Sequence, residues 1–169
     1  MLREHERLEV ARGQVREFEA LRRKMVKEQA TEALAKVFSM MQLCGIGLQS
    51  AWVFVMEFFG WRQFANRRQV ASLAGLPPTP YNSGGSDREQ GIGKAGNGLV
   101  RWMIVEIAWG WLRFQLQSQL SQWYRERFAG GGSRMRRIGI VALARKLLIA
   151  LWRYVEYGVV PEGAKLKAA

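Results

Sequence analysis

The sequence predicts an all-α fold, in which a long N-terminal helical arm precedes a compact helical bundle. Residues 2–37 contain no proline and one glycine, and their apolar residues recur at spacings near three and four. No stretch of the chain shows the sustained alternation of apolar and polar residues that indicates strands. With 169 residues, of which 49% are hydrophobic, the chain can bury a core of ordinary size.

The arm is predicted over residues 1–37. Leu8, Ala11, Val15, Phe18 and Met25 form its apolar stripe, with charged residues between them. This spacing favours a coiled-coil element that pairs with a second copy of the chain, which would make the protein a homo-oligomer. A single solvated helix that packs on its own bundle is the alternative.

The second predicted domain covers residues 38–160 and holds about five helices, followed by a flexible tail at 161–169. Helices are expected at 48–59, 67–74, 99–117, 120–128 and 138–157. Residues 75–98 contain three of the four prolines and seven of the 18 glycines. That composition predicts a long irregular loop, which in a compact domain is usually functional or disordered.

The charge of the chain is strongly positive, at +12, and it is concentrated after the arm. Residues 1–37 hold nine basic and seven acidic residues, whereas residues 38–169 hold 17 and seven. This excess predicts a polyanionic partner in the second domain. A 20-residue uncharged run at 37–56 is long enough for a membrane-spanning helix. Its glutamines and glycines favour two packed helices instead, so no membrane partner is expected.

Metal and disulfide chemistry have few candidate residues. Cys44 is the only cysteine and His5 the only histidine, so neither a disulfide nor a zinc cluster can be assembled. The acids after residue 38 are scattered, which argues against a two-metal nuclease site within this chain. The absence of disulfides indicates a cytoplasmic protein.

Two glycine motifs could hold phosphates. Gly45-Ile46-Gly47 lies between two apolar helices and is similar to a helix-hairpin-helix turn, in which glycines admit a DNA backbone. The alternative is a plain tight turn. Residues 91–97 are predicted to form a phosphate-binding nest. The predicted phosphate-binding residues are Gly91, Gly93, Lys94, Gly96, Asn97 and the nearby Arg101.

The remaining candidates are a hydroxyl loop and a basic cluster. Ser83 stands beside two glycines near Arg88, where a serine could attack a phosphodiester, with Tyr81 and Ser86 as rival nucleophiles. A turn-forming linker is the alternative at this loop. Arg134, Arg136 and Arg137 would add electrostatic affinity for DNA.

The order of these motifs resembles the transposases of insertion sequence family 110/116/902, from about Met41 to Gly158. The matching pieces are 43–51 (LCGIGLQSA), Phe64, 71–77 (ASLAGLP), 83–85, 91–97 (GIGKAGN), Arg101, 142–147 (ALARKL) and Trp152. The family's common serine before lysine in the second glycine motif is Gly93 here.

The resemblance implies that Ser83 is the nucleophile of DNA strand transfer and that Gly84 and Gly85 shape its loop. It also implies a DNA partner at the bacterial nucleoid and, as in members of the family, a structured guide RNA. The family's metal-binding acids lie in an N-terminal RuvC-like domain that we expect to be missing from this chain. No cofactor is therefore expected here, and Mg²⁺ is expected only with that domain.

Three functions are consistent with these observations. The first is a serine-dependent transposase half-site that lacks its metal domain. The second is a non-catalytic, basic DNA- or RNA-binding remnant of a transposase, which would bind in a salt-dependent way without a covalent product. The third is a basic membrane-surface protein, in which the seven tryptophans form an interfacial belt.

Overall fold

A computed structural model describes the backbone of residues 2–83, 86–93 and 95–167, and the side chains of 3–77, 92–93 and 95–167. In order, the described helices are α1 (Leu2–Glu28), α2 (Glu32–Met41), α3 (Leu48–Phe54), α4 (Arg67–Leu73), α5 (Gly98–Phe114), α6 (Gln119–Phe128) and α7 (Ser133–Tyr157). A π-helical turn, η1 (Val55–Phe59), continues α3. The predicted all-α class is confirmed, with one addition: β1 (Pro78–Ser83) and β2 (Ser86–Ile92) form an antiparallel hairpin.

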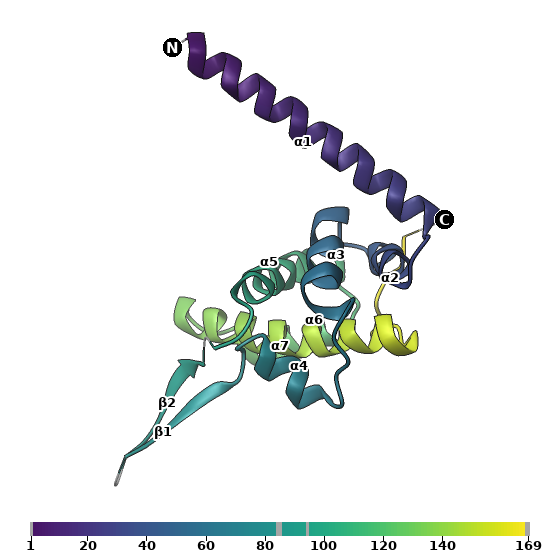
Figure 1. The fold of residues 1–169 in the computed structure, drawn as a ribbon. Coiled ribbons are helices and arrows are strands. Elements are labelled where there is room, and N and C mark those ends of the chain that lie inside the picture. The colour runs from purple at the N-terminus through teal and green to yellow at the C-terminus, as the bar shows by residue number, and fades with distance from the viewer. Residues whose placement is uncertain (1, 84–85, 94, 168–169) are drawn as a thin grey trace.

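The long helix α1 projects away from the bundle (Figure 1). It ends at Glu28 because Gln29 adopts a left-handed conformation, with φ at 46°. A new helix, α2, then begins behind Thr31, whose hydroxyl accepts a hydrogen bond from the Leu34 amide at 3.3 Å. The prediction of one helix through residue 37 is therefore wrong, since the buried Leu34 and Val37 place this segment in the bundle.

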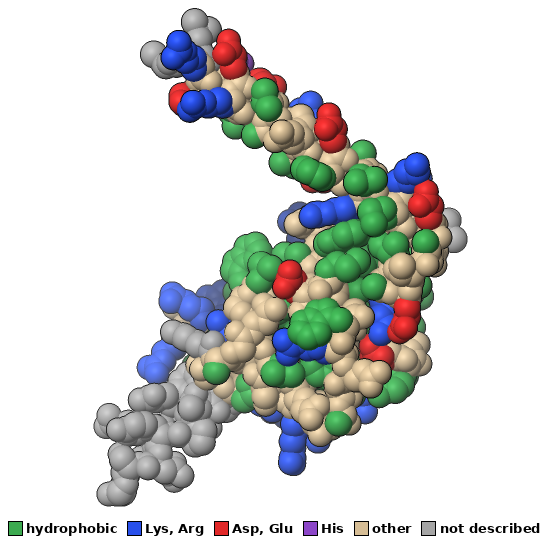
Figure 2. Space-filling view, in the orientation of Figure 1, with side chains coloured by type: hydrophobic (Ala, Val, Ile, Leu, Met, Phe, Trp, Pro, Cys, Tyr) green, Lys and Arg blue, Asp and Glu red, His purple; other side chains and the backbone are tan. Residues whose placement is uncertain are grey.

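The root of α1 is fixed to α3, while most of its length is solvated. Val26 is only 2% exposed. Arg22 donates to Gln49 Oε1 at 3.0 Å, and its guanidinium lies 5.2 Å from the centre of the Trp52 ring. Further out, hydrophobic side chains such as Val15 and Phe18 are exposed, and Figure 2 shows hydrophobic side chains among charged ones along the arm.

The core is organised around α7. Leu143, Leu147 and Leu151 are fully buried at intervals of four residues, which is one face of a helix. This helix packs mainly against α5 and α6, with α4 and α2 completing the bundle. The longest bundle helix therefore has one side committed to the interior and the other left for the surface.

An aromatic cluster fills the interior beside the π-helical turn. Phe58 and Phe59, at the end of η1, are both fully buried. Their rings are 5.3 Å apart in an edge-to-face arrangement. Phe64 lies 4.9 Å from Phe58 and 6.4 Å from Trp152, so the cluster links η1 to α7.

The C-terminal segment is hydrogen-bonded to the bundle. The side-chain amide of Gln115 donates to the carbonyls of Cys44 and Lys165, and its oxygen accepts from the Lys165 amide at 2.6 Å. The Lys167 amide donates to the Gln42 carbonyl at 2.7 Å. The expectation of a flexible tail at 161–169 therefore does not hold for residues 162–167; residues 168 and 169 lie outside the described part.

An ion pair joins α2 to α7. Lys36 Nζ lies 2.8 Å from Glu156 and 3.0 Å from Glu32, with 14% of the Lys36 side chain exposed. Burial lowers the pKa of Lys36, but the hydrogen bonds and charges of the two carboxylates outweigh it, so the pKa is raised. The stabilisation is complete below the ordinary lysine pKa and is lost as the pH rises through the raised value.

We expect Ser118→Ala to destabilise the fold more than the loss of an exposed cap does. Ser118 Oγ accepts a 2.8 Å hydrogen bond from the buried Trp111 indole and caps α6 by accepting from the Ser121 amide. Removing it leaves a buried N–H unpaired and uncaps the helix, a loss of about 2–4 kcal/mol.

Chemical denaturation measures this difference, with Thr31→Ala as the control. Thr31 caps α2 from an exposed position, so Thr31→Ala should lower the stability by only about 1 kcal/mol. Equal losses in the two variants would contradict the importance of the buried network.

Candidate functional site

The second glycine motif forms the base of the β-hairpin. The Gly93 amide donates to the Pro77 carbonyl at 2.9 Å, and the Asn97 amide donates to the Leu73 carbonyl at 2.8 Å. Gly93 and Asn97 thus lie directly against the segment 73–77. Two pieces of sequence that are about 20 residues apart become one structural unit.

Two glycines make this close approach possible. Gly96 has φ at 110°, and a Cβ at this position would overlap the Leu73 carbonyl. Gly75 has φ at 68°, and its Cβ would overlap the Ala95 carbonyl. Only glycine is free of both the steric and the conformational penalty at these positions.

Asn97 and Arg101 have structural partners in this unit. Asn97 caps α5, since its Oδ1 accepts from the Val100 amide at 3.0 Å. Arg101 Nη1 donates to the Ala74 carbonyl at 3.2 Å, which ties α5 to the end of α4. The sequence predicts both as phosphate ligands, which stays a prediction; in the structure both hold this unit together. Lys94, in the same motif, lies outside the described residues.

The hairpin corrects the prediction of an irregular loop at 75–98. β1 pairs with β2 from Pro78 opposite Ile92 to Ser83 opposite Ser86, with one irregularity after Pro78. Arg88 lies opposite Tyr81 in this register, and Gly91 is part of β2. The hairpin projects from the bundle at the end opposite to α1 (Figure 1).

Ser83 is the last residue of β1, five residues beyond Pro78. At about 3.3 Å per residue, its backbone lies about 17 Å along the strand from the hairpin base. Gly84 and Gly85, which were expected to shape its loop, lie outside the described residues. The structure therefore separates the candidate nucleophile from the glycines at the base.

The first glycine turn lies elsewhere in the molecule. Gly45 has φ at 90°, and a Cβ there would be 3.2 Å from the Phe114 side chain, whereas Gly47 has open space. Lys167 Nζ donates to the carbonyls of Met41 and Ile46 at 2.5 and 2.8 Å. The turn is held by α5 and by the C-terminal segment, and it is not brought together with the hairpin base.

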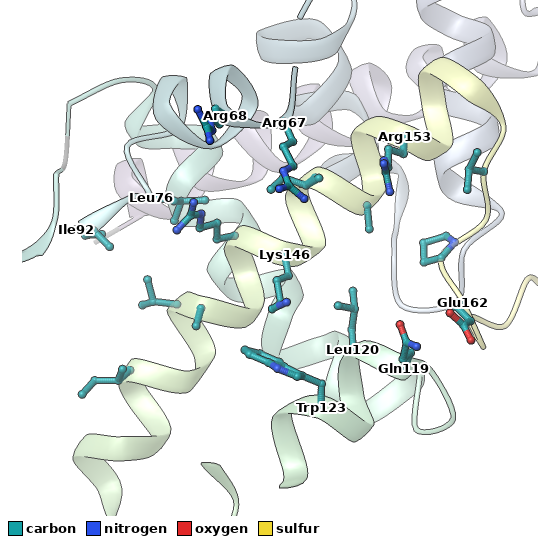
Figure 3. Close-up of a pocket in the computed structure, with 18 of the residues that line it drawn as sticks. Arg67, Arg68, Leu76, Ile92, Gln119, Leu120, Trp123, Lys146, Arg153 and Glu162 are labelled. Atoms are coloured by element: carbon teal, nitrogen blue, oxygen red, sulfur yellow. The ribbon is translucent and has the colours of Figure 1, made fainter. Parts of the chain in front are cut away.

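A groove of about 1330 Å³ lies along the outer face of α7. It runs between α4 on one side and α6 with the C-terminal segment on the other, as Figure 3 shows. Leu76 and Ile92, at the base of the hairpin, line one part of it. The groove and the hairpin are therefore continuous.

Positive charge dominates the groove. Among its lining residues in the described part of the chain, Glu162 is the only acid, against seven cations. The cations are Arg67, Arg68, Arg134, Arg137, Arg145, Lys146 and Arg153. Among the residues whose side chains are described, none of these seven forms an ion pair with a carboxylate.

The predicted basic cluster is only partly in this groove. Arg134 and Arg137 line it, at the N-terminal end of α7. Arg136 is exposed but is not a lining residue, and its backbone carbonyl accepts a hydrogen bond from Tyr124. Positive side chains in the first turn oppose the helix dipole, and no side chain caps this helix at Gly132. Both effects favour an anion at this end.

Sequence reasoning did not assign the other five cations to a site. Arg145, Lys146 and Arg153 lie within about 100° of one another around a helix, so they share one of its faces. That spacing was available as a signal. Arg67 and Arg68 carried none, because only the packing of α4 on α7 brings them to the groove.

Trp123 is the aromatic residue of the groove. The Lys146 ammonium lies 4.7 Å from its ring centre, and the Arg127 guanidinium lies 5.6 Å away. Both contacts are cation–π interactions. Figure 3 shows Trp123 and Lys146 facing each other across the space between α6 and α7.

The fold and the site define a basic, mostly helical module with a cationic groove and a projecting hairpin. The sequence profile described as the transposase IS116/IS110/IS902 family matches residues 39–125. The chain belongs to this family, as its motif order indicated. The match includes both glycine motifs and the hairpin, and it stops before α7.

Two relatives from Sinorhizobium fredii bear transposase names. One, y4rJ, is 43% identical over 178 aligned positions, which cover 98% of this chain and 43% of that protein. The other, y4qE, is 36% identical over 75 positions, covering 44% of this chain and 19% of the relative. The chain thus spans less than half the length of these curated relatives.

A membrane-spanning helix and a metal site are two further possibilities that the described residues bear on. No helix among them is long and apolar enough to cross a membrane. Within the same residues, no three His, Cys, Asp or Glu side chains are grouped so as to hold a metal ion.

We expect Gly96→Ala to disrupt the hairpin base. The substitution combines an unfavourable positive φ with an overlap on the Leu73 carbonyl, a loss of about 2–4 kcal/mol. Thermal unfolding followed by circular dichroism measures it.

Gly98→Ala is the matched control, two residues further along. Gly98 is the first residue of α5, and its Cβ would meet only the end of Arg101 at 3.4 Å. The control should be neutral or stabilising by up to about 1 kcal/mol. A Gly96→Ala protein as stable as the control would show that the loop can separate from α4 without loss.

Proposed function

We propose that this chain is the DNA-handling part of an insertion-sequence transposase, which grips a DNA backbone in the α7 groove and presents Ser83 as a nucleophile. The observation that carries the proposal is the continuity of the groove with the hairpin base through Leu76 and Ile92. Seven cations without carboxylate partners among the described side chains are thereby adjacent to the element that ends in Ser83.

The electrostatics of the groove support a phosphodiester partner. Like charges this close repel one another, so the arrangement lowers stability unless an anion is bound. Arginine also matches the geometry of phosphate oxygens with paired N–H donors. A polyanion of regularly spaced phosphates satisfies several of these side chains at once.

The proposed reaction is a transesterification at phosphorus. The Ser83 oxygen forms a bond to phosphorus, the bond from phosphorus to one deoxyribose oxygen breaks, and the serine proton is released to a base. The leaving oxygen takes up a proton, and the phosphoserine link preserves the bond energy for strand transfer. Arg88, in β2, is the proposed electrostatic partner of this phosphate, and Lys94 is proposed to contact a different phosphate of the DNA backbone.

The assembly proposed around this module has two further parts. The exposed apolar stripe of α1, which includes Leu8, Val15 and Phe18, is suited to pairing with a second copy of the chain. A structured guide RNA, as in members of the family, is the other proposed partner. The place of action would be the bacterial nucleoid.

A non-catalytic nucleic-acid-binding role is the second candidate function. It is favoured by the structural roles found for Gly96, Asn97 and Arg101, since residues that hold the hairpin base need no catalytic explanation. Under this candidate the groove binds DNA as proposed, but no covalent intermediate forms. The two candidate functions differ only in whether Ser83 acts as a nucleophile.

The combined variant Arg145→Gln and Lys146→Gln should weaken DNA binding and reduce its dependence on salt. Each lost phosphate contact lowers the slope of log affinity against log salt by about 0.9 on duplex DNA and by about 0.7 on a single strand. Fluorescence anisotropy over a salt series measures the slope.

Arg16→Gln is the control for this series, because Arg16 is exposed on the distant arm. It should leave the slope unchanged. If the groove variant kept the parental slope, the groove would be excluded as the phosphate-binding surface.

Ser83→Ala should abolish a covalent protein–DNA adduct. The measurement is denaturing-gel trapping on a nicked DNA substrate, with the family's N-terminal domain supplied separately. Ser86→Ala is the matched control, because Ser86 is the register partner of Ser83 across the hairpin. Trapping that survives Ser83→Ala but not Ser86→Ala would move the nucleophile to the other strand.

A further inference from the structure

We infer that the α7 groove holds a single strand of DNA and discriminates against the duplex. The inference rests on the proposed function of the groove in DNA binding, and it specifies which form of DNA enters.

The floor of the groove is apolar. Ile138 is 52% exposed, Val159 is 54% exposed and Val160 is 40% exposed. Val141 and Ile149 are partly buried and continue this surface along α7. Exposed apolar side chains enclosed by charged ones indicate a surface that is covered when a partner binds.

A duplex cannot use such a floor. Its bases are stacked inside, so it would place phosphates and sugars against Ile138 and Val159, and an ion on an apolar surface loses hydration without gaining a partner. A single strand can turn its bases toward the floor while its phosphates reach the cations on either side. Single-strand binding typically combines a basic groove with aromatic side chains on which bases stack, and Trp123 is the aromatic residue of this groove.

Trp123 provides a base-stacking position. In the structure its ring is in contact with the Lys146 ammonium, 4.7 Å from the ring centre. A phosphate attracts a lysine more strongly than an aromatic ring does, since the ion carries a full charge. Movement of Lys146 to a phosphate would free a face of the indole for a base.

The dimensions set the length of the bound strand. Arg134 and Arg153 are 19 residues apart on α7, which is about 28 Å at 1.5 Å per residue. Stacked nucleotides advance by about 3.4 Å each, so the groove accommodates at most about eight of them.

The described part of the lining offers few acceptors for the O–H of a ribose 2′-hydroxyl. Recognition of RNA uses hydrogen bonds to the 2′-hydroxyl. Among the described lining residues, the side chains that could accept such a bond are Gln119 and Glu162, both at one end of the groove near the C-terminal segment. The central part of the floor is formed by the apolar side chains named above.

The test compares three 12-nucleotide probes by fluorescence anisotropy with the full chain: oligo-deoxythymidine, a mixed-sequence duplex and oligo-uridine. We expect the single DNA strand to bind at least about fivefold more tightly than either of the others at one salt concentration. A duplex bound as tightly as the single strand, or RNA bound as tightly as DNA, overturns the inference but leaves nucleic-acid binding intact. Failure of all three probes to bind at low salt would refute the proposed function itself.

Substitutions in the floor of the groove test whether the preference for a single strand arises there. Ile138→Ser should reduce single-strand affinity by about threefold to tenfold and leave duplex affinity unchanged, with the similarly exposed Leu99→Ser on α5 as its control. Trp123→Leu should reduce single-strand affinity by about tenfold. Its control is Trp102→Leu, at an exposed position outside the groove.

Trp123 also packs against Phe128, so its variant is checked for stability. Trp123→Phe preserves an aromatic face and should restore most of the affinity. Floor variants that bind the single strand as tightly as their controls would contradict the inference.

Discussion

The division of α7 into a buried side and a groove side is the constraint on which the rest of the molecule depends. Leu143, Leu147 and Leu151 fix one side of this helix in the core. That fixation makes the opposite side a rigid scaffold, on which Arg145 and Arg153 are held about 12 Å apart by the helix rise. A groove built on a mobile loop could not keep such a spacing.

The candidate site was only partly predictable from the sequence. The basic excess after residue 37 and the glycine motifs were visible, and the second of those motifs adjoins the groove. The groove was not visible, because Arg67 and Arg153 are 86 residues apart and meet only through helix packing. The motif pattern predicts a phosphate-binding role for Gly96, but its close approach to Leu73 could not be read from the sequence.

The fold was predictable where the helical signal is long and uninterrupted, as in α5 and α7. It was not predictable at Gln29, where the helix stops without glycine or proline. The hairpin was also missed, since Pro78 and Pro80 in β1 are residues that usually argue against a strand. The C-terminal segment is held mainly by backbone groups and Gln115, and such hydrogen bonds leave no composition signal.

The π-helical turn has a consequence for how this family module tolerates changes in length. Since the hydrogen bonds of η1 span one more residue than those of an α-helix, deleting a single residue there would restore regular winding and rotate α3 by about 100° relative to the segment after η1. The buried side chains of α3 and of the segment with Phe58 and Phe59 would then no longer face the same core, and the aromatic contact between Phe64 and Trp152 would be disturbed. A one-residue gap should therefore be rarer at 55–59 than in the surface loops of this domain.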